Sequence, residues 1–131
     1  MKDIVVEQEH RGYVIRVEAD HSVIHSRLYG FFDVDFETQY YNDYCQVLDA
    51  FPHSKLYLLV DTRAYPPQSK AVQEIRQKLF QKLSGYPVVK IAYLVEQVLS
   101  RLQSERLSRD ASRFQAAFFK SEDEARAWLL E

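Results

Sequence analysis

Alternating apolar and polar positions dominate the first part of the chain. Apolar residues recur at every second position over Tyr13–Val17, which predicts a strand with one wetter face. A weaker alternation over Ile4–Gln8 predicts a short strand before it. The residues Asp20–Ser22 favour a turn, so Val23–Gly30 is expected to return as the next strand.

Helical spacing of apolar residues begins after Gly30. Asp33 is placed to cap the first turn of a helix, and Pro52 ends it. At 100° per residue its apolar positions fall within about 120° of arc, a clear stripe. These positions are Phe36, Tyr40, Tyr44, Val47, Leu48 and Phe51.

Three more helices are predicted further along the chain. One is capped by Ser69 and stopped by Gly85. The segment Gln97–Ser112 is helical in composition, with a bend expected near Ser104. The spacing from Ser121 to Glu124 is that of a capping box, which opens a terminal helix. That helix is expected to bury Ala125, Trp128 and Leu129.

Between these helices lie short apolar runs without alternation. Leu56–Val60 and Val88–Val95 suit parallel strands buried on both faces, and Phe114–Phe119 is expected to be the last strand. Leu56–Val60 should lie inside the sheet, beside Val88–Val95 and one other strand. The order predicts an α/β fold: a mixed sheet of five to six strands with parallel central strands, right-handed crossovers and about four helices.

Composition narrows the class of protein. The chain has 131 residues, 47% hydrophobic and 27% charged, and we expect one domain over residues 1–131. No apolar run approaches the length of a membrane span, and the start lacks a signal-peptide pattern, so we expect a cytoplasmic protein. A net charge of −2 argues against nucleic acid as a partner. Three glycines are too few for a dinucleotide or phosphate loop.

Two local patterns carry a family resemblance. They are an apolar strand ending in aspartate, Tyr57–Arg63, and a strand ending in Phe followed by an acidic helix start and Ala-x-x-Trp-Leu, Ala117–Leu129. With the element order, they resemble the STAS-type fold, specifically the SpoIIAA-like family that is sometimes grouped with Sec14-like domains. The resemblance implies a non-enzymatic binding or regulatory domain of bacterial type.

Two branches of this family imply different functions. In anti-sigma-factor antagonists a serine at the start of the helix after the central strand is phosphorylated, within Asp-Ser-Ser-Gly. The corresponding segment here is Pro66-Pro67-Gln68-Ser69-Lys70, which lacks the aspartate, the second serine and the glycine. SpoIIAA-like members are instead associated with apolar ligands or membrane lipid.

The predicted ligand site lies where the central strands end. Asp61, Thr62, Arg63, Tyr65 and Ser69 fall in or after the loop expected over Asp61–Gln68. Ligands of open α/β sheets bind at that edge, and a helix start suits an anionic head group. An amphipathic molecule with an anionic head is therefore the expected ligand, with a protein partner as the alternative. Ser69 is either only a helix cap or, in the antagonist alternative, the phosphoacceptor.

Other candidate groups give weaker signals. Four arginines could meet anionic lipid or an acidic partner, although their i,i+4 spacing to Glu105 and Asp110 also allows pairing along one helix: Arg101, Arg106, Arg109 and Arg113. Cys45 is expected as a partly exposed thiol. His21 and His25 are expected at the surface, with no metal site and no cofactor. Peripheral membrane contact, a homodimer and a small enzyme stay open as alternatives.

Overall fold

A computed structural model describes residues 3–51, 54–96 and 114–131. The helix expected over Gln97–Ser112 lies outside these residues. The described elements follow the predicted order: β1 (Ile4–Glu7), β2 (Gly12–Glu18), β3 (Val23–Tyr29), α1 (Val34–Ala50), β4 (Leu56–Ala64), α2 (Lys70–Leu83), β5 (Val88–Leu94), β6 (Gln115–Phe119) and α4 (Glu122–Leu129).

The strands form one six-stranded sheet in chain order, β1 to β6. β1, β2 and β3 pair antiparallel, whereas β3, β4, β5 and β6 pair parallel. β4 lies between β3 and β5, so the predicted central place of Leu56–Val60 is confirmed. Its buried leucines explain this place, because no face of this strand suits water. The α/β class and the mixed sheet are confirmed as well.

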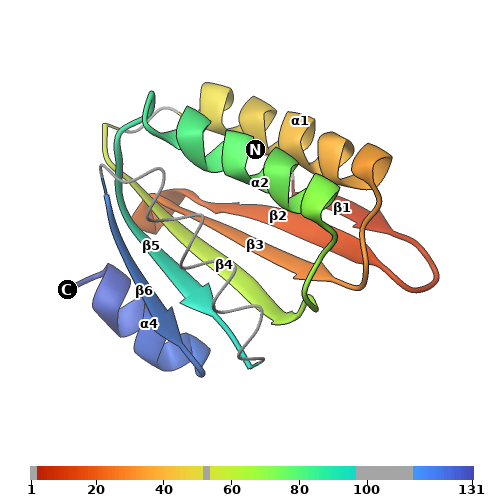
Figure 1. The fold of residues 1–131 in the computed structure, drawn as a ribbon. Coiled ribbons are helices and arrows are strands. Elements are labelled where there is room, and N and C mark those ends of the chain that lie inside the picture. The colour runs from red at the N-terminus through yellow and green to blue at the C-terminus, as the bar shows by residue number, and fades with distance from the viewer. Residues whose placement is uncertain (1–2, 52–53, 97–113) are drawn as a thin grey trace.

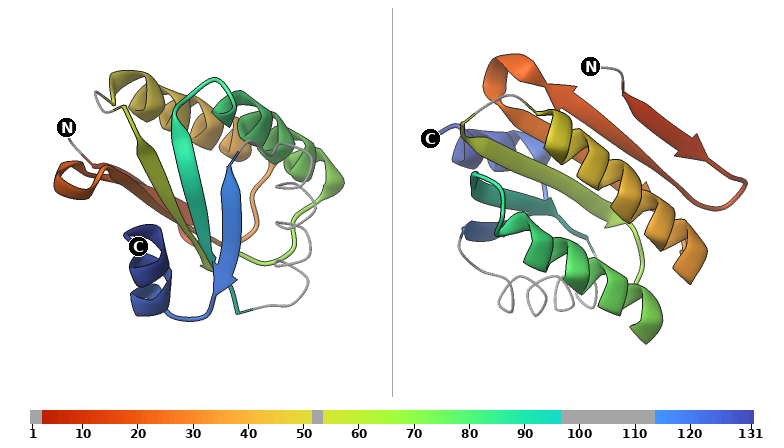
Figure 2. Two further views of the ribbon diagram at one scale, coloured as in Figure 1. Left: turned by 90° about the vertical axis from the view of Figure 1, so that its left-hand side faces the viewer. Right: turned by 90° about the horizontal axis from the view of Figure 1, so that it is seen from above.

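Helices cover the two faces of the sheet unequally. α1 and α2 lie on one face, and the shorter α4 lies on the other (Figures 1 and 2). Successive side chains of β4 lie on opposite faces of the sheet: Leu58 belongs to the large core under α1 and α2, and Leu59 belongs to the small core under α4. The small core consists of Val23, Leu59, Ala92, Leu94, Ala125 and Leu129.

Side chains cap the three described α-helices where the sequence predicts caps. The amide of Phe36 donates to Asp33 Oδ1 over 2.8 Å, which opens α1. The amides of Val72 and Glu124 donate to the hydroxyls of Ser69 and Ser121 over 3.3 and 3.2 Å. Each cap satisfies an amide that the helix itself leaves unpaired.

Three local predictions are wrong. β4 continues to Ala64, so the segment from Asp61 to Ala64 is strand rather than loop. The reason is that strand pairing continues, with Asp61 opposite Leu94 of β5 and Ala64 opposite Tyr29 of β3. Cys45 is buried in the large core, since α2 packs beside α1 and covers a second side of that helix. Trp128 is only half-buried, although Ala125 and Leu129 are buried as predicted.

Candidate functional site

Asp61 and Arg63 lie together on the α4 side of β4. They are two residues apart in a strand and therefore share a face. Arg63 donates from Nη2 to Asp61 Oδ2 over 2.8 Å and from Nε to Oδ1 over 3.0 Å, and its amide also reaches Oδ1. Burial opposes ionisation of Asp61, but these hydrogen bonds outweigh it and lower the pKa of that carboxyl.

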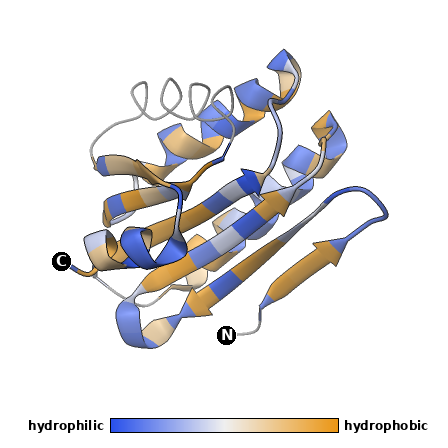
Figure 3. Ribbon diagram, turned by 90° about the horizontal axis from the view of Figure 1, so that it is seen from below, coloured by the Kyte–Doolittle hydropathy of each residue, from blue (hydrophilic) through white to orange (hydrophobic). Residues whose placement is uncertain are grey.

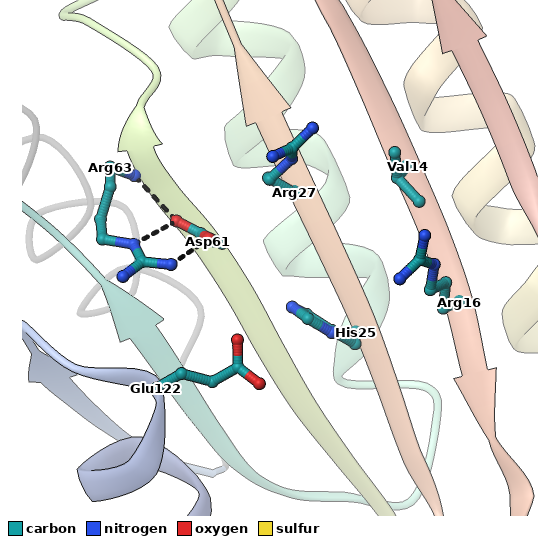
Figure 4. Close-up of a pocket in the computed structure, with 7 residues that line it drawn as sticks. All are labelled: Val14, Arg16, His25, Arg27, Asp61, Arg63 and Glu122. Atoms are coloured by element: carbon teal, nitrogen blue, oxygen red, sulfur yellow. Dashed lines mark hydrogen bonds and ion pairs between the residues drawn. The ribbon is translucent and has the colours of Figure 1, made fainter.

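This ion pair borders a pocket of about 280 Å³ on the open half of the sheet. α4 packs mainly against β4, β5 and β6 on this face, and hydrophilic and hydrophobic stretches are interspersed along the strands beside it (Figure 3). Strands β2, β3 and β4 and the start of α4 all contribute (Figure 4). The lining residues are Val14, Arg16, His25, Arg27, Asp61, Arg63 and Glu122.

Strand register brings the lining residues of β2, β3 and β4 into rows. Val14 pairs with Arg27, and Arg27 pairs with Asp61, while Arg16 pairs with His25. Sequence reasoning missed Arg16, His25 and Arg27 as site residues. The available signal was their spacing of two within predicted strands, which puts polar side chains on one face. That spacing did not indicate which strand lies beside Asp61.

The three arginines of the pocket differ in their partners. Arg63 is held by Asp61, and Arg16 Nε lies 3.3 Å from the half-exposed carboxylate of Asp3. Arg27 is exposed and has no carboxylate partner in the part of the chain that the structure describes. It lies over the ring of Tyr29, 5.6 Å from the centroid. Among the three pocket arginines, Arg27 is thus the one that no described carboxylate binds.

His25 is mostly covered, which corrects its expected place at the surface. Its side chain is 17% exposed, with Nδ1 3.6 Å from Glu18 Oε2 and 3.4 Å from Arg126 Nη2. Nε2 is buried without a hydrogen-bond partner among the described residues. Burial lowers the pKa of His25 and outweighs the nearby carboxylates, so the ring is neutral at pH 7.

Tyr65 lies on the other face of the sheet from Arg63. It packs in the large core, with its ring 5.1 Å from that of Phe32. Its hydroxyl donates to Glu37 Oε1 over 3.1 Å, and Arg76 donates to the same fully buried carboxylate twice, over 2.9 Å each. The structure therefore does not bring Tyr65 into the pocket with Asp61 and Arg63.

Thr62 and Ser69 also lie away from the pocket lining. Thr62 is buried, and its hydroxyl donates to the carbonyl of Leu94 over 2.8 Å. Ser69 is exposed at the start of α2. The preceding Gln68 ties this loop to the β3–α1 connection, because its side chain accepts from the amide of Phe32 and donates to the carbonyl of Gly30.

Three further sequence predictions concern other parts of the chain. The four arginines of the predicted anionic-partner patch lie outside the described residues: Arg101, Arg106, Arg109 and Arg113. Within residues 3–51, 54–96 and 114–131, no three histidine, cysteine or carboxylate side chains group as metal ligands. None of the described helices combines the length and apolarity needed to cross a membrane.

Comparison with solved structures identifies the architecture. An uncharacterised DUF3478-family protein with a SpoIIAA-like fold, from Shewanella loihica PV-4, matches with a TM-score of 0.74 over 95% of this chain and 98% of that one, at 16% identity. The chain has a SpoIIAA-like fold. An anti-sigma factor antagonist from Mycobacterium paratuberculosis matches less closely, with a TM-score of 0.57 over 99% of this chain and 94% of that one, at 12% identity.

The STAS-like resemblance read from the sequence is thus confirmed at the level of the fold. No protein-family model matches the sequence, and no curated protein matches it either. At these identities the matches show a shared fold and not a shared ligand. The function must therefore be inferred from this chain's own residues.

Proposed function

We propose that this SpoIIAA-like protein is a non-enzymatic binding domain that takes a small amphipathic anion in the pocket beside Asp61 and Arg63. The observation that carries the proposal is Arg27, which lines the pocket without a carboxylate partner among the described residues. Arg16 and Arg63 line the same pocket, and a guanidinium group suits carboxylate or phosphate oxygens.

An apolar surface adjoins the cationic side of the pocket. Val14 lines the pocket, and its cross-strand partner Val5 is 53% exposed on the neighbouring strand. Paired residues of adjacent strands share a face, so Val5 and Val14 continue the row that starts at Arg27. A short hydrocarbon chain can lie along this pair while its anionic head meets Arg27.

The state of the titratable groups supports binding rather than catalysis. Asp61 is held by two side-chain hydrogen bonds from Arg63, and its lowered pKa keeps it ionised and a weak base. The Nε2 atom of His25 is covered and cannot reach a ligand without rearrangement. Neither group is placed for proton transfer to a molecule in the pocket.

Titration with hexanoate, followed by backbone amide NMR, tests this function. Binding should perturb β2, β3 and the start of α4, and Arg27→Gln should weaken it about tenfold, the usual scale for a hydrogen bond to a charged group. Lys78→Gln is the matched control, because it removes one exposed cation from α2 on the other side of the sheet. No binding of hexanoate, or equal affinity in Arg27→Gln, would contradict the proposal.

A phosphorylated Ser69 is the second candidate, and its exposure at the start of α2 favours it. A phosphate there would meet unpaired first-turn amides and lie beside Lys70. Intact-mass measurement of protein purified from cells should then show one added phosphate that Ser69→Ala removes. Absence of that increment under every growth condition tested would reject the switch.

Ser69 has a structural role that is testable separately. Its hydroxyl caps α2, so Ser69→Ala should lower the free energy of unfolding by about 1 kcal/mol. Ser69→Asp should keep stability close to that of the parent, since aspartate also caps helices. Urea unfolding measures both variants, and an unchanged Ser69→Ala variant would show that the cap contributes nothing.

A further inference from the structure

We infer that the ligand of this pocket carries a cationic group as well as an anionic one. Two arginines line one side of the pocket, called its cationic wall, and two carboxylates line the opposite side, called its acidic wall. The inference rests on the proposed function for the site's location and adds the chemical class of the ligand. Figure 4 shows Arg16 and Arg27 on one side and His25 in the middle. The other side holds Asp61, its partner Arg63, and Glu122.

The cationic wall comes from adjacent strands. Arg27 of β3 pairs with Val14, and Arg16 of β2 lies two residues further along the same face as Val14. Arg27 has no carboxylate partner among the described residues, and the pair of Arg16 with Asp3 is solvent-exposed and therefore weak. These two guanidinium groups are available to an incoming carboxylate or phosphate.

The acidic wall joins β4 to α4. Asp61 is 7% exposed and already accepts from Arg63, whereas Glu122 is 40% exposed. Glu122 Oε2 accepts from Arg126 Nε over 2.7 Å, and in the described parts of the chain Oε1 accepts no hydrogen bond. Glu122 Oε1 can therefore receive an ammonium group, whereas the charge of Asp61 is already balanced by Arg63.

Opposed walls discriminate against ligands with one kind of charge. A simple anion that fills the pocket must approach Asp61 and Glu122, and a simple cation must approach three arginines. Like charges brought together in this way cost binding free energy. An ω-amino acid has carboxylate and ammonium groups at opposite ends of a short chain. It meets a complementary group at each end when that chain crosses the pocket past His25 towards Glu122, a different course from the row of Val14 and Val5.

Backbone amide NMR titration of the whole chain with three probes of matched length tests the inference. ε-Aminohexanoate should bind about tenfold more tightly than hexanoate, because its ammonium group adds a charge-assisted hydrogen bond. Hexylamine should bind more weakly than either. Equal or weaker binding of ε-aminohexanoate relative to hexanoate would overturn the inference and leave the proposed anion site standing.

Variants at the acidic wall test whether the preference for ε-aminohexanoate depends on Glu122 itself or on the overall charge of the protein. Glu122→Gln keeps an acceptor for Arg126 but removes the charge, so it should abolish the preference for ε-aminohexanoate without weakening hexanoate. Asp123→Asn is the control, because it removes an exposed carboxylate from the same helix turn. Loss of the preference in both variants, or in neither, would overturn the inference. Failure of all three probes to bind would overturn the proposed function together with it.

Discussion

At the scale of single residues, the burial of His25 should make the stability of the fold depend on pH. Its pKa is lowered from the ordinary 6.5 by burial. Below pH 6.5 the unfolded chain therefore binds a proton at this residue that the folded protein resists. The free energy of unfolding should fall as the pH drops from 6.5 towards the lowered pKa, and His25 should contribute no slope above 6.5. Urea unfolding of parent and His25→Gln protein measures this, and the variant should lose that part of the slope.

The groups around His25 set the direction of its shift. Glu18 of β2, Asp61 of β4 and Glu122 of α4 favour its protonated form, whereas burial and Arg126 of α4 oppose it. His21→Gln is the matched control, because His21 is exposed next to the same strand. A slope between pH 5 and 7 that persists in His25→Gln and disappears in His21→Gln would contradict this account.

At the scale of elements, α4 packs against the sheet through one face of the helix. Leu129 is 1% exposed in the small core, and its neighbour Leu130 is 50% exposed. Leu129→Ala should cost about 2–5 kcal/mol of unfolding free energy, because it leaves a cavity beneath the helix. Leu130→Ala should stay within about 0.5 kcal/mol of the parent protein. Chemical unfolding of both variants checks this, and equal costs would contradict it.

Polar contacts secure α4 beside that small core. Arg126 donates to both carboxylate oxygens of Glu18 over 2.7 and 2.8 Å, which ties the helix to β2. Lys90 of β5 donates to the carbonyl of Trp128 over 2.7 Å. These contacts place Glu122 at the mouth of the pocket, so the packing of α4 also positions a proposed ligand group.

For the whole molecule, the sheet order predicts a gradient of local stability. β4 lies between two parallel neighbours and beneath helices on both faces, whereas β1 has four residues and lies at an edge of the sheet. Amide hydrogen exchange should therefore be slowest in β4 and its neighbours and fastest in β1. Exchange followed by NMR measures this, and β1 amides protected as long as those of β4 would contradict the gradient.

Local patterns predicted much of the fold because their causes are local. The caps at Asp33, Ser69 and Ser121 depend on amides three residues away, and helix periodicity depends on residues three and four apart. The central place of Leu56–Val60 followed from its uninterrupted apolarity. Cys45 was misjudged because its burial depends on α2, which packs against α1 from a different part of the chain.

By itself, the sequence determined the described elements, their order and the α/β class, and it placed Asp61 and Arg63 at a candidate site. Only the tertiary structure decided that Arg16, Arg27 and Glu122 share that site. Alternation shows which strand residues have a common face, but strand neighbours, register and the face that a helix covers depend on long-range packing. The pair of Arg126 with Glu18 spans 108 residues, and no local spacing predicts a contact over that distance.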